Sequence, residues 1–381
     1  MIATRALRMA AKTAVSSPKQ TVLNIESTEI KPNSTIFSLI QPTGVFHVGN
    51  YLGAVRSWVD LQAASPADTK LIFGVADLHA LTVPKDNSDT LRFCRKQAVA
   101  SIIATGIDPE RCIVFQQSQV PEHTQLYWYL STITGMGYMN RMLQWKSKAN
   151  LEDNASIFDE AAASLRLGLF AYPALQAADI LLYKSNYVPV GEDQSQHLEL
   201  TRHITNAFNK QYPNHDTKEP IFPEPKTIFA PFKKVASLRD PSKKMSKSDP
   251  NKTSCIYITD GPDRIRKCIR RAVTDSIQGP ITYDPETRPG IANLLTMASG
   301  FLRIDSPEAV LEQIQPKDHK ELKDGVAEIV IEGLMPVREE YTRLIDDMSY
   351  IDEVSRRGAE RAREIAVRTM KEVERAIGLD N

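Results

Sequence analysis

Short apolar runs alternate with amphipathic stretches through the first part of the chain, and this alternation predicts a parallel sheet. Runs rich in β-branched and aromatic residues lie at 35–40, 70–77 and 112–115, and their lengths suit buried strands. Helical periodicity follows the first run, from His47 onward, and the second run, over 88–104. Strands that alternate with helices form βαβ units, and such sheets bind ligands at the carboxyl ends of their strands.

The pattern is mainly helical after the third run. Between residues 125 and 205 one break, at 187–190, predicts a further strand. The stretch 220–231 holds four prolines and is predicted to be a loop-rich connection. Beyond Gly261 the chain is predicted to be all-helical, with a long amphipathic helix over 352–377 that ends at a glycine.

Composition narrows the class of protein. The 381 residues are 42% hydrophobic and 25% charged, as in a soluble globular protein. No run approaches the roughly 18 uninterrupted apolar residues of a membrane helix, so we expect no membrane partner. The formal net charge is zero, so a surface for nucleic acid has to be local. The cysteines form no CxxC pair, which predicts reduced thiols and no metal site built from protein ligands.

The N-terminal 25 residues differ from the rest of the chain. They carry arginine and lysine, are rich in alanine, serine and threonine, and contain no acidic residue before Glu26. This composition is typical of a mitochondrial transit peptide, and no apolar h-region of a secretory signal follows the charges. The alternative is an extension without an address. We assign residues 1–30 to a transit peptide or disordered extension and expect the mitochondrial matrix.

Three motifs suit a nucleotide site. The turn over 42–50 contains glycine and leads into a helix N-terminus, which favours phosphate. Its His-x-Gly-Asn motif is weak alone, because a helix capped by a structural histidine looks the same. The string Lys-Met-Ser-Lys-Ser at 244–248 could neutralise phosphate charge or be a solvated basic loop. At 191–193, Gly-Glu-Asp after a strand suits ribose hydroxyls, although Asp193 could be a plain helix N-cap.

Together, the 47–50 and 244–248 motifs resemble the "HIGH" and "KMSKS" elements of class I aminoacyl-tRNA synthetases, with Asn50 in the last place of the first. The resemblance implies a Rossmann-like fold that activates an amino acid with ATP as substrate, with Mg²⁺ bound through the ATP phosphates. Catalysis then consists of positioning and charge stabilisation. The implied catalytic residues are Lys244, Lys247, His47 and Lys148. The implied ATP contacts are Gln41, Pro42, Thr43, His47, Gly49, Asn50, Gly191, Glu192, Asp193, Val235, Lys244, Met245, Ser246, Lys247 and Ser248.

The resemblance narrows to tryptophanyl-tRNA synthetases of the bacterial and mitochondrial type. It is carried by residues 172–183, which look like their tryptophan-binding helix, and by 140–148, 272–276 and 289–295. The implied tryptophan contacts are Asp179, Phe37, His79, Gln176, Tyr172 and Gln194. Bacterial relatives typically have methionine at the place of Gln176, so glutamine here resembles the mitochondrial branch.

Asp179 suits this role chemically. It lies among apolar residues of its predicted helix, where a carboxylate needs a partner. Indole offers a single N–H donor, which could form a charge-assisted hydrogen bond with this carboxylate. The alternative is a structural salt bridge within the protein.

The resemblance also implies the domains and partners. A Rossmann-like catalytic domain would span 34–260, with a helical insertion at 123–185 for tryptophan binding and dimer contacts. A helical anticodon-binding domain would span 261–381. The implied partners are tRNA(Trp), L-tryptophan, ATP and a second copy of the chain. The basic residues of the predicted last helix interleave with glutamates, so a solvated face is as good an interpretation as a tRNA contact.

Two alternatives remain at this point. The first is a tyrosyl-tRNA synthetase, which would need polar partners for a phenol hydroxyl. The second is an RNA-binding paralogue that kept the fold and lost catalysis, against which the intact motif at 244–248 argues.

Overall fold

A parallel sheet lies at the centre of the protein. The structure is a computed structural model, and it describes residues 22–24, 29–83, 87–149, 151–163, 165–229, 235–304 and 306–380. The sheet has six strands in the order β1-β6-β5-β2-β3-β4, and all of its strand pairs are parallel. The strands are β1 (Val22–Asn24), β2 (Thr35–Ile40), β3 (Lys70–Val75), β4 (Ile113–Gln116), β5 (Tyr187–Val190) and β6 (Lys226–Phe229). The four predicted strands are confirmed as β2, β3, β4 and β5, and with them the α/β fold class.

Two further strands were not predicted. β6 lies inside the proline-rich stretch 220–231, so the prediction of a loop was wrong for these residues. Its residues stand between prolines rather than on them, which leaves their backbone N–H groups free to pair with β5. β1 pairs with β6 although it lies within the stretch assigned to an extension. The folded part therefore begins by Val22, and residues 1–21 lie outside the described residues.

Helices surround the sheet. The segment predicted as one helix after β2 is helical throughout, but Tyr51–Val55 is wound as a π-helix, η2. The α-helices are α1 (Val48–Asn50), α2 (Arg56–Ala64), α3 (Asp77–Ala80), α4 (Ser88–Ala104), α5 (Glu122–Ser131), α6 (Met136–Asn140), α7 (Leu143–Lys148), α8 (Leu167–Leu182), α9 (Ser195–Gln211), α10 (Pro262–Arg270), α11 (Pro289–Leu302), α12 (Ala309–Ile314), α13 (His319–Asp346) and α14 (Met348–Ile377). Short 3₁₀ helices are η3 (Gln117–Gln119), η4 (Glu160–Ala162) and η5 (Glu192–Gln194). Among the described residues, no helix is both long and apolar enough to cross a membrane.

The sheet separates two hydrophobic cores. Successive side chains of a strand point to opposite faces, so Ile36 of β2 joins one core and Phe37 joins the other. The first core continues through α4 into α11 and α13, so the C-terminal helices share it with the sheet. The second core joins the sheet to α5, α8 and α9. The side chain of Phe37 is therefore directed toward the α8 side of the sheet.

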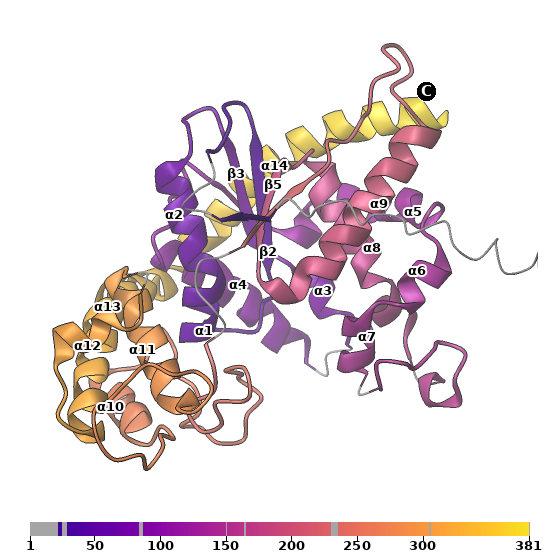
Figure 1. The fold of residues 1–381 in the computed structure, drawn as a ribbon. Coiled ribbons are helices and arrows are strands. Elements are labelled where there is room, and N and C mark those ends of the chain that lie inside the picture. Colours follow the sequence, from indigo (N-terminus) through magenta and orange to yellow (C-terminus); the bar gives the residue numbers. More distant parts are fainter. Residues whose placement is uncertain are drawn as a thin grey trace, which may run out of the picture.

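The helices α10 to α13 form a group of their own at one side of the molecule (Figure 1). The last helix, α14, returns along the sheet. α14 begins four residues before the predicted start at 352 and ends as predicted, with Gly378 in the left-handed conformation at its C-cap. A side chain at Gly358 would collide with the Val114 carbonyl, because its Cβ would lie 1.8 Å from that oxygen. This glycine lets α14 lie directly on β4.

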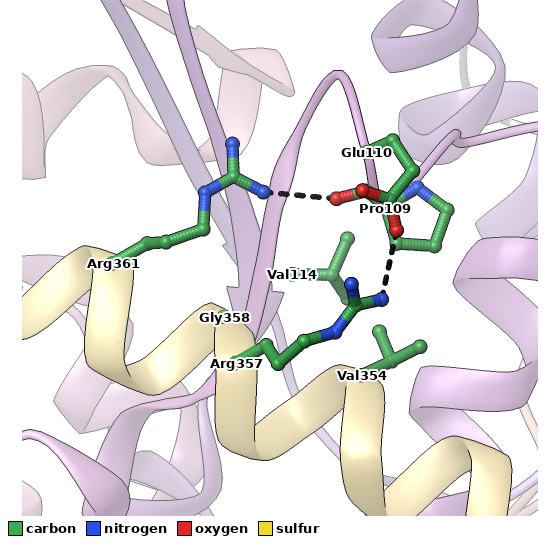
Figure 2. Close-up of a pocket in the computed structure, with 7 residues that line it drawn as sticks. All are labelled: Pro109, Glu110, Val114, Val354, Arg357, Gly358 and Arg361. Carbon is green, nitrogen blue, oxygen red and sulfur yellow. Dashed lines mark hydrogen bonds and ion pairs between the residues drawn. The ribbon is translucent and has the colours of Figure 1, made fainter.

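Arginines of α14 hold it to the sheet domain. Around a small pocket beneath the helix, Arg357 pairs with Glu110 at 2.8 Å and Arg361 donates to the Pro109 carbonyl at 2.9 Å (Figure 2). Arg363 also pairs with buried Glu122 at 2.8 Å. These pairings favour a structural role for these basic side chains over the tRNA contact that the sequence left open.

Candidate active site

His47 closes the turn between β2 and α1 through a reciprocal cap. Its Nδ1 accepts a hydrogen bond from the Asn50 backbone N–H at 3.1 Å, and Asn50 Oδ1 accepts one from the His47 backbone N–H at 3.2 Å. Burial, with the charges of Lys247 and Lys244, lowers the pKa of His47 to about 3. The ring is therefore neutral and able to accept this bond. The helix cap is present, and a role of His47 in catalysis stays a prediction.

The lysine loop, residues 244–248, lies against this turn. Lys247 Nζ donates to the backbone oxygen of Thr43 at 2.9 Å and to its hydroxyl at 3.1 Å. Burial lowers the pKa of Lys247 to about 8, since the charged form loses hydration there. Gly49 also faces this loop, because a Cβ on it would lie 3.5 Å from that of Met245. Segments far apart in sequence thus form one basic corner.

Backbone pairing fixes the base of the lysine loop. Ala236 and Lys244 form an antiparallel bridge, and the Met245 N–H donates to the Val235 carbonyl at 3.1 Å. Met245 and Val235 are buried, at 2% and 3% exposure, so the loop is anchored from below. The hydroxyls of Ser246 and Ser248 lie 2.9 Å apart at its tip.

The remaining predicted nucleotide contacts occupy two turns that follow strands. Gln41 and Thr43 are exposed in the turn after β2, and Pro42 between them is buried. Gly191 and η5, which contains Glu192, follow β5. A Cβ at Gly191 would lie 2.7 Å from Asp193 Oδ1, so the Asp193 carboxylate lies directly beside this glycine. Because β2 and β5 are parallel neighbours, both turns lie at the carboxyl edge of the sheet, where ligands bind.

Asp179 lies on α8 with 1% exposure and is hydrogen-bonded from three sides. Oδ1 accepts from Gln117 Nε2 at 2.6 Å and lies 2.7 Å from His123 Nδ1. Oδ2 lies 2.7 Å from His79 Nε2. Burial alone would raise the pKa of Asp179, but hydrogen bonds from His123 and His79 lower it to about 2. The carboxylate is therefore ionised. His79, which was predicted as a tryptophan contact, is hydrogen-bonded to Asp179.

Aromatic side chains adjoin Asp179. Phe37 stacks on Tyr183 with 5.2 Å between ring centroids, and Tyr183 OH lies 2.8 Å from His123 Nε2. The Tyr172 ring stands edge-on to His79 at 6.1 Å. The predicted residues Phe37, His79, Tyr172 and Asp179 are thus brought together on the α8 side of the sheet.

A polar cluster links this group to the 191–194 turn. Gln194 Oε1 accepts from His197 at 2.9 Å and from Gln176 at 3.4 Å, while its Nε2 donates to Asp193 Oδ2 at 3.1 Å. His197 also lies 3.2 Å from the Tyr172 hydroxyl. The predicted residues Gln176, Asp193 and Gln194 therefore form one network.

Lys148, the last residue of α7, completes this cluster. Its Nζ lies 4.1 Å above the Tyr172 ring centroid, an arrangement that stabilises the cation. Burial lowers the pKa of Lys148, while the charge of Asp193 opposes the shift. Lys148 therefore contacts the network of Tyr172 and Gln194. Lys247 instead bonds to the turn after β2.

Sequence reasoning did not find several residues of the site. Gln117, His123 and Tyr183 surround Asp179, and His197 connects Gln194 with Tyr172. Nothing in the local pattern marks His123 and Gln117, which lie 56 and 62 residues from Asp179 in the chain. A search for partners of the one acid on an apolar helix could have proposed them.

Comparisons with known proteins agree with this geometry. Residues 29–334 match the family model described as tRNA synthetases class I (W and Y). The chain is 46% identical to the mitochondrial tryptophan–tRNA ligase of Saccharomyces cerevisiae, over 98% of this chain and 98% of that protein. The chain belongs to the tryptophan–tRNA ligase family. This identity separates tryptophan from tyrosine, which the family model leaves together.

Solved structures of the tryptophan–tRNA ligase family share the fold. The tryptophanyl-tRNA synthetase of Mycoplasma pneumoniae superposes with a TM-score of 0.77 at 29% identity, covering 91% of this chain and 98% of that one. The enzyme of Campylobacter jejuni complexed with ADP and tryptophan superposes with a TM-score of 0.71 at 31% identity, covering 91% of this chain and 100% of that one. The Rossmann-like catalytic fold is therefore that of this family.

Proposed function

We propose that the site joins L-tryptophan to tRNA(Trp) in two steps, first forming tryptophanyl-adenylate from ATP and then transferring the tryptophanyl group to the tRNA. The membership in the tryptophan–tRNA ligase family supports this activity. The observation that carries it is the placement of the Lys247 ammonium on Thr43, in the turn where a Rossmann-like sheet receives phosphates. The test is tryptophan-dependent exchange between ATP and pyrophosphate by the purified chain. Exchange driven by tyrosine instead, or no exchange, would contradict the proposal.

The basic corner is proposed to bind the ATP phosphates. The tryptophan carboxylate attacks the α-phosphorus, and the bond to the pyrophosphate oxygen breaks as the adenylate forms. Lys244 and Lys247 would stabilise the charge on the leaving pyrophosphate, as donors aimed at developing charge do. Mg²⁺ would enter with the ATP phosphates and supply further positive charge there.

The turns after β2 and β5 are proposed to hold the rest of the nucleotide. Gln41, Pro42, Gly49 and Asn50 would line one side, and Gly191 to Asp193 the other. The exposed carboxylate of Asp193 in the turn after β5 supports a ribose contact, because a carboxylate can accept from two vicinal hydroxyls.

Asp179 is proposed to recognise the indole N–H despite its existing partners. Each carboxylate oxygen offers two acceptor positions. Oδ1 has both of them filled, by Gln117 and His123. Oδ2 is bonded to His79, so its second acceptor position is the one left for indole. The hydrogen bonds within the protein and the ligand contact are therefore compatible, and the bond to His79 fixes the orientation of the acceptor.

The other residues around Asp179 are proposed to complete the tryptophan slot. Phe37, His79 and Gln176 would contact the indole ring. Tyr172 and Gln194 would contact the ammonium and carboxylate groups, with Lys148 near the reacting carboxylate. The shared network of Tyr172, His197 and Gln194 supports this division, because it places polar groups at one end of an apolar slot.

A homodimer is proposed to form through the helical insertion at 123–185. Exposed large apolar side chains gather in this part of the sequence, and such side chains favour a protein interface. They are Trp128, Met136, Leu143, Phe158 and Leu167, with exposures of 66%, 56%, 37%, 87% and 75%. Measurement of the molecular mass in solution tests the dimer, and a monomeric mass at micromolar concentration would contradict it.

The helical part from 261 is proposed to bind the anticodon, and the catalytic domain to span from β1 to about residue 260. The proposed location is the mitochondrial matrix, supported by the mitochondrial relative and by the basic, acid-free composition of the N-terminus. Fusion of the first 25 residues to a fluorescent reporter tests the address. Diffuse cytosolic fluorescence would contradict it.

A further inference from the structure

The side chain of Asn293 holds the segment that pairs with the base of the lysine loop. Asn293 of α11 is 8% exposed. Its Oδ1 accepts from the Ala236 N–H at 2.8 Å, and its Nδ2 donates to the Ala236 carbonyl at 3.1 Å. A carboxamide that bonds both backbone groups of one residue acts as a substitute β-strand, so it fixes the position and orientation of that residue.

Ala236 is the residue that pairs with Lys244. The antiparallel bridge joins their backbones, and the Met245 N–H donates to the adjacent Val235 carbonyl at 3.1 Å. Asn293, Ala236 and Lys244 therefore form three successive layers from the helix to the lysine loop. A shift of Asn293 would be passed to Lys244 through hydrogen bonds rather than through loose packing.

α11 is itself held closely against the same region. A Cβ at Gly290 would lie 2.1 Å from the Val273 carbonyl oxygen, so only glycine allows this approach. The Val273 N–H donates to the Leu238 carbonyl at 2.8 Å, two residues after Ala236. The N-terminal half of α11 thus contacts Ala236 directly through Asn293 and reaches Leu238 of the same segment through Val273.

The other end of α11 contacts the helix that follows the His47 turn. Arg56 of α2 is 4% exposed and donates to the Gly300 carbonyl at 3.2 Å. Gly300 lies in the last turn of α11, where carbonyls lack donors within the helix. Asp60 lies 3.5 Å from Arg56 and 3.5 Å from Arg303 at the same junction. α11 therefore spans from the lysine loop to the helix of the His47 turn.

We propose that Asn293 is a positioning residue for the activation step, which sets the place of the loop lysines relative to the ATP-binding turn, with α11 as the strut between the two elements. The inference rests on the proposed role of the lysine loop. Asn293 touches no reacting atom in this account and acts through Ala236 and Lys244. Its loss should lower the rate constant of tryptophan activation without changing tryptophan binding.

The test compares Asn293→Ala with a matched control, Asn209→Ala. Asn209 is another carboxamide that bonds backbone groups of one short segment, accepting from Ile221 and Phe222 at 3.0 Å each and donating to Phe222 at 2.8 Å. It lies on α9 and has no part in the proposed site. Both variants lose backbone hydrogen bonds, so both should lower the melting temperature.

Exchange kinetics then separate positioning from stability. Asn293→Ala should lower kcat for ATP–pyrophosphate exchange by about tenfold to a hundredfold, since misplacement of a catalytic group by about 1 Å costs that much. The KM for tryptophan should stay unchanged. Asn209→Ala should leave both constants unchanged. Equal kcat values for the two variants, or a loss in Asn293→Ala that appears in the tryptophan KM, would overturn the proposal.

A double mutant with Lys247→Ala tests the role of Asn293 separately from the role of the lysine loop. If Asn293 acts through the loop, its substitution should reduce kcat by a smaller factor when Lys247 is already absent. The same factor in both backgrounds would overturn the positioning role. If Lys247→Ala alone leaves exchange unchanged, the proposed function of the loop has failed. If Lys247→Ala lowers exchange but Asn293→Ala does not, only the present inference has failed.

Discussion

The two ends of the candidate site are held in different ways. The Asp179 carboxylate is buried and bonded to Gln117, His123 and His79. The Lys247 ammonium is partly exposed and bonded to the neutral oxygens of Thr43. The first arrangement fixes one acceptor in advance, as selection of a ligand requires. The second holds a charge with weak partners, which phosphate oxygens can replace because charge-assisted hydrogen bonds are stronger.

This difference predicts that substitution of Asp179 affects the fold, whereas substitution of Lys247 affects the reaction. Asp179→Ala leaves the donors of Gln117, His123 and His79 buried without their acceptor. A buried donor left without its acceptor typically costs about 1–3 kcal/mol, so the three together should cost about 3 kcal/mol or more. We expect the free energy of unfolding to fall by this amount in denaturant titration. A loss below about 1 kcal/mol, typical of exposed pairs, would show that the network is not structural.

Lys247→Ala should have the converse effect. The ammonium is proposed to stabilise charge that develops on pyrophosphate, and removal of one such donor costs about 3 kcal/mol, or roughly a hundredfold in kcat. The KM for tryptophan and the melting temperature should change little. Exchange kinetics and a thermal melt check both statements. A normal exchange rate would remove Lys247 from the mechanism.

The pH dependence of ATP use should report Lys247 as well. Burial lowers the pKa of Lys247 to about 8, so the free enzyme loses this positive charge as the pH rises through that value. Because kcat/KM reports groups of the free enzyme, kcat/KM for ATP should fall above pH 8. In Lys247→Arg the guanidinium stays charged, so this fall should disappear even if the overall rate is lower. A profile that is the same in both proteins would assign the fall to another group.

The sequence predicted the regular parts of the fold well and the marginal strands poorly. The bounds of β2, β5 and α4 were predicted to the residue, because an apolar run marks β2, a break in the helical pattern marks β5 and helical periodicity marks α4. β6 was missed because its four residues stand between prolines, and β1 because its three residues are too few to form a pattern. Both strands depend on pairing with each other or with β5, which no local pattern records.

The site shows the same division. Motifs that are contiguous in sequence, such as 47–50 and 244–248, identified the basic corner, and the bond from Lys247 to Thr43 places them together. Asp179 stood out because an acid on an apolar helix needs a partner. Its partners His123 and Gln117 come from other elements, so they required the fold. The structural contact and the proposed ligand contact, which the sequence treated as alternatives, are compatible because Asp179 has more than one acceptor position.

The central claim is that Asp179 Oδ2 recognises the indole N–H, and one comparison tests it most directly. ATP–pyrophosphate exchange is measured with tryptophan and with an analogue whose indole nitrogen is replaced by sulfur, for the unmodified chain and for Asp179→Asn. The substitution keeps size and an acceptor oxygen but removes the charge, which should cost about 1–3 kcal/mol with tryptophan. The analogue lacks the donor, so its kcat/KM should change less and the preference for tryptophan should narrow. If the variant loses both substrates in equal proportion, Asp179 serves the fold alone and the proposed slot is misplaced.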